Sequence, residues 1–105
     1  MNDERRTAER VPLPLEAKWA GQSGLHAARI SDVSMGGCYI ESLGQVSVGE
    51  RIDFEVQLPT GKWMHLNGQV AFVHPNMGFG VRFRELSELE SNLLEDIVNF
   101  GRLGK

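Results

Sequence analysis

The chain has 105 residues, 41% of them hydrophobic and 24% charged, and its formal net charge is -3. This length accommodates one domain with a hydrophobic core and is too short for two. The acidic balance argues against general binding of duplex nucleic acid, because a surface that binds many phosphates needs an excess of positive charge.

The sequence carries no pattern of secretion or membrane insertion. Its N-terminal residues are charged where a signal peptide needs an apolar core, and no apolar run approaches the roughly 18 residues of a membrane span. Cys38 is the single cysteine, so an internal disulfide cannot form. A lone cysteine fits a reducing compartment, and we therefore expect a cytoplasmic protein.

The segment "NDERRTAERVP", residues 2–12, places Arg5, Arg6 and Arg10 among acidic residues. Arginine has a planar fork of donors that pairs with phosphate oxygens and also matches the O6 and N7 acceptors of guanine. Arg6 and Arg10 are therefore able to aim two forks at one compact ligand. Two interpretations stay open at this point: a solvated charged tail, or a flexible ligand-binding leader over residues 1–12 that precedes a domain at 13–105.

Alternation of apolar and polar residues predicts short strands along most of the chain. In chain order, the predicted strands lie within residues 13–19, 25–34, 38–42, 52–58, 62–74 and 79–83. A glycine pair forms the corner between the second and the third, and the sequences "PTG" and "PNMG" are typical of later turns. About six short strands in so small a domain favour a mainly β fold that closes into a barrel and leaves no free edge.

The aromatic residues divide into two groups by strand parity. Core packing is the expected role of those that share parity with aliphatic neighbours, namely Phe54, Phe72, Phe79 and Phe83. Tyr39 and Trp63 fall out of phase and are expected to face outward. For each of them a contribution to a ligand surface or to a partner surface stays open at this point.

The period changes at Leu86, where apolar residues begin to recur every three or four positions and predict a C-terminal helix. The predicted stripe consists of Leu86, Leu89, Leu93, Ile97 and Phe100, with Leu94 and Val98 to its side. Ser87 and Glu90 fit a capping box, and Gly101 or Gly104 is expected to end the helix. So broad an apolar arc suits a helix sunk over one barrel mouth or, alternatively, a homodimer contact.

The sequence "DVSMGG" contains the pattern Asp32-x-Ser34-x-x-Gly37. Asp and Ser side chains cap turns and glycine tolerates positive φ, so one interpretation of the pattern is a β-corner without a ligand. The same residues also suit a ligand, because the N1 and N2 donors of guanine need an acceptor and glycine permits a close approach to the backbone. Together with the arginines, this segment would supply both the donors and the acceptors that a guanine nucleotide requires.

The two motifs together resemble the PilZ domain family. Its hallmarks are an RxxxR motif on an N-terminal loop and a D/NxSxxG motif on the barrel, matched here by "RRTAER" and "DVSMGG" in that order. The β-rich middle, the "GFGVRF" strand and the final helix are also similar to that family. The resemblance therefore covers nearly the whole chain.

The resemblance implies a six-stranded antiparallel β-barrel with a C-terminal α-helix that binds the bacterial second messenger cyclic di-GMP and needs no other cofactor. On this sequence, Arg6 and Arg10 would grip guanine and phosphate, Asp32 and Ser34 would hold a guanine, and Gly37 would shape the turn. Arg5 occupies a position associated in the family with ligand number, and an arginine there favours a stacked pair. We expect the ligand to fold the leader onto the barrel and to create a surface for an unidentified effector protein.

Catalysis and metal binding are not expected. The paired spacing of metal ligands is absent from the three histidines, His26, His65 and His74. Cys38 has no identifiable base beside it in the sequence, so we expect it to be a small buried hydrophobic residue and not a nucleophile. The alternatives to a receptor are a constitutive protein-interaction adaptor of the same fold and, less favoured because of the acidic balance, a barrel that binds single-stranded nucleic acid.

Overall fold

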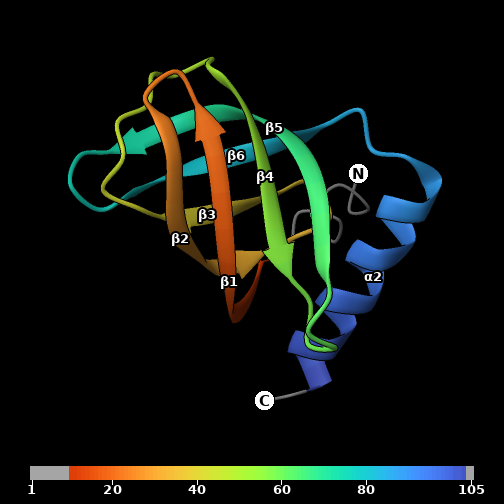
Figure 1. Cartoon of the computed structure of the whole chain (residues 1–105). Helices are drawn as coiled ribbons and strands as arrows, with labels where there is room; N and C mark the ends of the chain where they lie inside the picture. Colours follow the sequence, from red (N-terminus) through yellow and green to blue (C-terminus); the bar gives the residue numbers. More distant parts are fainter. Residues whose placement is uncertain (1–9, 104–105) are drawn as a thin grey trace, which may run out of the picture.

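The computed structural model of this protein describes residues 10–103. Six strands form a closed barrel in the order β1-β2-β3-β6-β5-β4, and β4 pairs with β1 to complete it (Figure 1). In chain order the elements are β1 (Val11–Gly21), β2 (Gly24–Val33), β3 (Gly37–Glu41), β4 (Arg51–Gln57), β5 (Trp63–His74), β6 (Gly78–Arg84) and α2 (Glu88–Leu103). Every pair is antiparallel. The predicted fold class is confirmed, and β1 begins at Val11, two residues before the predicted start.

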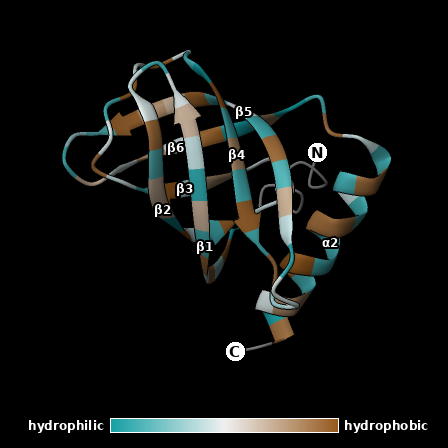
Figure 2. Cartoon of the chain, viewed as in Figure 1, coloured by the Kyte–Doolittle hydropathy of each residue, from teal (hydrophilic) through white to brown (hydrophobic). Residues whose placement is uncertain are grey.

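The strands alternate between a packed interior and a polar exterior, visible as alternating bands of hydropathy in Figure 2. Trp19 is the largest fully buried side chain; its ring meets Phe79 edge to face at 5.2 Å, and its Nε1 donates a hydrogen bond of 3.0 Å to Oγ of Ser42. That bond satisfies the one polar atom of a buried indole. The remaining core is mainly aliphatic and fills the barrel with residues from every strand.

The prediction that Phe72 lies in the core is wrong. β5 is irregular between Val70 and Phe72: Val70 pairs with Val81 inside the barrel, whereas Phe72 pairs with Gly80 and is 38% exposed. An extra residue in one strand, here Ala71, reverses the side-chain alternation beyond it. Phe54, Phe79 and Phe83 are buried as predicted.

The helix α2 closes one end of the barrel, as Figure 1 shows. Its N-terminus carries the predicted capping box: the Glu90 amide donates to Oγ of Ser87 at 3.1 Å, and the Ser87 amide donates to the Glu90 carboxylate at 3.0 Å. Leu94 and Ile97 meet barrel residues such as Leu15 and Met64 around a small apolar space at this end. The expected position over a barrel mouth is therefore confirmed.

The buried face of α2 is rotated from the predicted stripe. Leu94, Ile97, Val98 and Gly101 are its buried residues, whereas Leu89 and Phe100 are exposed. Counting apolar positions could not select the face, because the helix is apolar over a broad arc and the barrel surface decides which part it contacts. Gly101 does not end the helix; it lies inside α2, where a Cβ would be 2.5 Å from Cγ1 of Val11. Glycine is needed there because helix and strand approach closely.

Within residues 10–103, no helix is long and apolar enough to cross a membrane. The described part of the chain also holds no group of three or more His, Cys, Asp or Glu side chains placed to bind a metal ion.

The rotated helix face yields a paired test of stability. Leu94→Ala should lower the free energy of unfolding by about 2 to 5 kcal/mol, because it empties a fully buried position, whereas Leu89→Ala, at a side chain 68% exposed, should change it by less than about 0.5 kcal/mol. Urea denaturation measures both. Equal losses would show that the outer face of α2 is also covered, as in the homodimer alternative.

Candidate functional site

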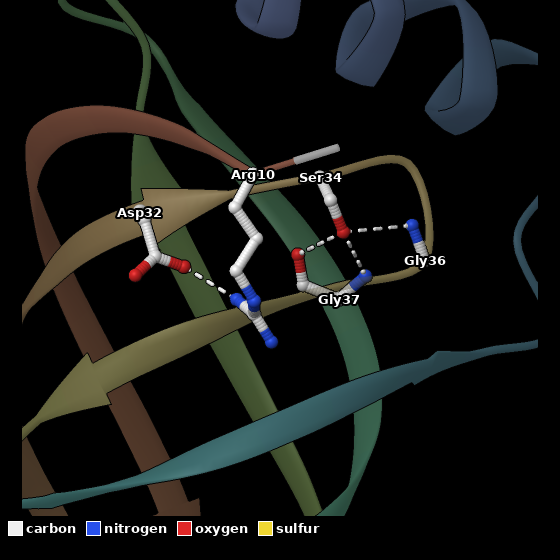
Figure 3. A network of polar contacts seen from close by, with 5 residues as sticks. All are labelled: Arg10, Asp32, Ser34, Gly36 and Gly37. Carbon is white, nitrogen blue, oxygen red and sulfur yellow. Dashed lines mark hydrogen bonds and ion pairs between the residues drawn. The ribbon is translucent and has the colours of Figure 1, made fainter. Parts of the chain in front are cut away.

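The described residues of the two sequence motifs gather where β1 begins and β2 turns into β3, near the end of the barrel that α2 covers (Figure 3). Arg10 directly precedes β1, Asp32 lies in β2, Ser34 lies in the connection, and Gly37 begins β3. Segments more than 20 residues apart in the sequence therefore build one surface. Arg5 and Arg6, the other predicted ligand-binding residues, lie outside the described residues.

Asp32 faces outward because β2 contains a bulge. Ile30 pairs with Ile40 and both are buried, while Val33 pairs with Cys38 and both are buried. Asp32 pairs with Tyr39 between them, and Ser31 is the extra residue. In a regular strand Asp32 would point into the core with Ile30; the bulge places its carboxylate on the outer surface instead. Asp32 thus belongs to a strand rather than to the turn in which the sequence pattern placed it.

Arg10 and Asp32 form an ion pair through Nη1 and Oδ1. The two side chains are 46% and 30% exposed, so water screens the pair and its net contribution to stability is about 0 to 1 kcal/mol. Little energy opposes its replacement by a ligand. The pair nevertheless holds a fork of donors and a carboxylate acceptor at one point of the surface.

The Ser34 side chain is hydrogen-bonded within the turn between β2 and β3. It is 5% exposed, its hydroxyl donates to the Gly37 carbonyl at 3.2 Å, and it accepts hydrogen bonds of 3.2 Å from the Gly36 and Gly37 amides. A backbone bond from the Ser34 amide to the Gly37 carbonyl at 2.8 Å closes the same turn. The geometry gives Ser34 a structural function, which is to fix the exit of β2 just after Asp32.

Gly37 is required for close packing. It has no positive φ, in contrast to Gly24, Gly49 and Gly61, so its backbone conformation does not require a glycine. A Cβ at position 37 would overlap the carbonyl oxygen of Val81 on β6, whereas one at Gly36 would meet nothing within 4 Å. The second glycine of the pair therefore lets β3 and β6 approach, and the first lies at the open surface.

Arg82 is a neighbouring cation that the motif analysis missed. It pairs with Gly37 across β3 and β6, faces outward and is exposed. No side-chain hydrogen bond or ion pair joins its guanidinium to another residue within the range 10–103. The alternation of Phe79, Val81 and Phe83 was sufficient to place Arg82 on the outer face, but only the strand order puts it beside the motif.

Cys38 contributes no reactive thiol to this surface, and two of the histidines are held in contacts with aromatic side chains. Cys38 is fully buried, and burial followed by the nearby Asp32 carboxylate raises the pKa of its thiol. A thiol of raised pKa is a poor nucleophile, and the prediction of a small buried hydrophobe is confirmed. His26 stacks on Trp19 with 4.3 Å between ring centroids, and Nδ1 of His74 lies 3.0 Å from the Tyr39 hydroxyl.

Comparison with protein families matches residues 4–100 to the PilZ domain. The chain belongs to the PilZ domain family. No curated protein matches the sequence. Five solved structures similar to this PilZ domain are 16 to 20% identical to it, and this similarity shows a shared fold and nothing finer.

Three solved structures illustrate that fold. The PilZ domain of YcgR from Escherichia coli, solved with cyclic di-GMP, is 17% identical with a TM-score of 0.78 over 95% of this chain and 93% of that one. The PilZ domain of CeSA from a cellulose-synthesizing bacterium is 16% identical with a TM-score of 0.69 over 93% and 100%. The inhibitor of motility MotI/DgrA from Bacillus subtilis is 17% identical with a TM-score of 0.75, and the match covers 91% of this chain but 50% of that protein.

The glycine pair gives a test of the turn geometry. Gly37→Ala should lower the free energy of unfolding by about 1 to 3 kcal/mol or more, because the new Cβ overlaps the β6 backbone, which cannot move aside as a flexible side chain could. Gly36→Ala, with open space around it, should be tolerated within about 0.5 kcal/mol. Chemical denaturation of both variants gives the comparison, and similar losses would contradict a packing role specific to Gly37.

Proposed function

We propose that this PilZ domain is a non-enzymatic receptor for cyclic di-GMP. The observation that supports it best is the ion pair between Arg10 and Asp32, which joins the arginine motif to the D/NxSxxG motif on the outer face of the barrel. Relatives of the same fold were solved with cyclic di-GMP, among them YcgR and the PlzA protein of Borreliella burgdorferi. In this proposal the ligand replaces the ion pair.

The chemistry of the two side chains suits a guanine nucleotide. The Asp32 carboxylate is able to accept from the N1 and N2 donors of the base, and the Arg10 guanidinium is able to donate to a phosphate or to O6 and N7. Each group exchanges one partner for another, so neither is left without a hydrogen bond. The exchange costs little, because the pair is exposed and weak.

In the proposal Arg5 and Arg6 complete the site from the N-terminal leader. A bidentate arginine contact contributes roughly 1 to 3 kcal/mol, while micromolar affinity requires about 8 kcal/mol, so Arg10 and Asp32 alone are insufficient. Ordering the leader costs about 1 to 2 kcal/mol per residue fixed. Barrel contacts must therefore supply much of the binding energy. Ser34 and Gly37 act indirectly, by fixing the turn that follows Asp32.

Closure of the leader over the bound ligand is the proposed output. It would turn a charged segment into part of the barrel surface and so create a docking face for an effector protein.

The expectation that Arg5 favours a stacked pair of ligands belongs to the same proposal. Titration calorimetry gives its stoichiometry directly, and one ligand per chain would contradict it.

Thermal unfolding tests receptor function first. Ligand at a hundred times its dissociation constant should stabilise the folded state by about 2.7 kcal/mol, which raises the midpoint by roughly ten degrees or more in a domain of this size. Cyclic di-GMP should produce the shift and GTP at equal concentration should not. Absence of a shift at saturating cyclic di-GMP would favour the constitutive adaptor instead.

Substitutions at the ion pair test the assigned residues. Arg10→Ala and Asp32→Ala should each weaken cyclic di-GMP binding about 5- to 100-fold, because each removes a charged ligand contact. The midpoint of unfolding without ligand should hardly change, since both side chains lie on the surface. Arg51→Ala, at an exposed arginine on β4, is the matched control and should bind normally. Unfolding of the Arg10 variant would mean that Arg10 serves the fold and not the ligand.

A further inference from the structure

One row of outward-facing residues crosses the barrel from the motif residues to β5. Asp32 of β2 pairs with Tyr39 of β3, Tyr39 pairs with Gly80 of β6, and Gly80 pairs with Phe72 of β5. The bulges at Ser31 and Ala71 bring Asp32 and Phe72 into this row, since each would face the core in a regular strand. The proposed ligand surface therefore continues past Asp32 onto two aromatic rings.

The rings lie over the backbone of β6, where two glycines leave room for them. A Cβ at Gly78 would be 2.9 Å from Cε2 of Tyr39, and a Cβ at Gly80 would overlap the ring of Phe72. Successive outward positions of a strand are about 6.6 Å apart. The ring centroids of Tyr39 and Phe72 are 6.1 Å apart with 30° between their planes. The two rings are thus neighbours on the sheet, inclined only slightly to each other.

His74 completes the cluster beside Tyr39 and Phe72. Its Nδ1 lies 3.0 Å from the Tyr39 hydroxyl, and its ring centroid is 5.6 Å from Tyr39 and 5.1 Å from Phe72. Burial, with the carboxylates of Glu41 and Asp32, raises the pKa of Tyr39, so the phenol stays neutral and protonated at neutral pH. A neutral ring beside an acceptor carboxylate is suited to a purine that carries N–H donors on its edge.

We propose that Tyr39 and Phe72 form a stacking shelf on which a guanine base of the ligand lies, with its edge toward Asp32. The inference rests on the proposed function and extends that site across β3, β6 and β5. Stacking would add binding free energy to the contacts of the arginines and Asp32, because a base stacked on an aromatic ring contributes substantially to affinity. Tyr39 and Phe72 are the binding residues in this proposal, and His74 is their neighbour on β5.

Covering strand glycines with aromatic rings also stabilises sheets, so the test must separate stability from binding. Tyr39→Leu and Phe72→Leu keep apolar side chains over the glycines but remove the flat ring. Each should weaken cyclic di-GMP binding by about 5- to 100-fold in titration calorimetry. Tyr39→Phe keeps the ring and loses only the contact with His74, so it should bind nearly as the unaltered chain does.

Trp63→Leu is the matched control. Trp63 is another exposed aromatic residue of β5, 39% exposed, but it lies at the other end of the strand with Nζ of Lys18 4.5 Å from its ring centroid. Its loss should leave affinity unchanged. Melting curves without ligand should show that each variant is folded at the temperature of the titration.

Tyr39 is the single tyrosine of the chain, so its ring protons give an isolated NMR signal. Stacking of a base should shift these signals upfield when cyclic di-GMP is added. If the unaltered chain binds but Tyr39→Leu and Phe72→Leu bind equally well, the shelf is refuted and the receptor function stands. If Tyr39→Phe is as weak as Tyr39→Leu, the hydroxyl and not the ring face matters, which also overturns stacking. Failure of the unaltered chain to bind would refute both proposals.

Discussion

Two single-residue bulges, at Ser31 in β2 and Ala71 in β5, place Asp32 and Phe72 on the outer surface of this barrel. A closed barrel requires each strand to give alternate side chains to one small interior, and a bulge is the local device that resets the alternation. Without these bulges, Asp32 would be a buried carboxylate and Phe72 another core ring. With them, an acceptor and an aromatic face lie in the same cross-strand row, and the interior remains apolar.

The turn between β2 and β3 depends on that arrangement and also stabilises it. Ser34 satisfies its own hydroxyl and two backbone amides within the turn, so the chain leaves β2 in one defined direction. Gly37 then brings β3 against the backbone of β6, which places Tyr39 next to Gly80 and Arg82 next to the motif. Residues that resemble ligand groups in the sequence thus divide into two kinds. Arg10 and Asp32 present functional groups to solvent, whereas Ser34 and Gly37 hold the scaffold.

The same scaffold separates stability from recognition. The core is made by inward residues and by the buried face of α2, and neither supplies a group to the outer row. The ion pair between Arg10 and Asp32 is exposed and adds little to the free energy of unfolding. A surface of this kind can exchange internal contacts for ligand contacts at low cost, and it therefore suits a reversible receptor better than a rigid structural joint.

The sequence by itself determined the strands, the capped C-terminal helix and the two motifs, because alternation, capping and turn chemistry are local properties of the chain. Only the tertiary structure decided that Asp32 and Phe72 face outward, that Leu94 rather than Leu89 is the buried leucine of α2, and that Gly37 is needed for packing. Each of these depends on a partner distant in sequence: the register of a neighbouring strand, the barrel surface below the helix, or the backbone of β6. Contacts of this kind produce no periodic pattern of apolar residues within one strand or helix. The spacing of residues in the sequence therefore could not predict them.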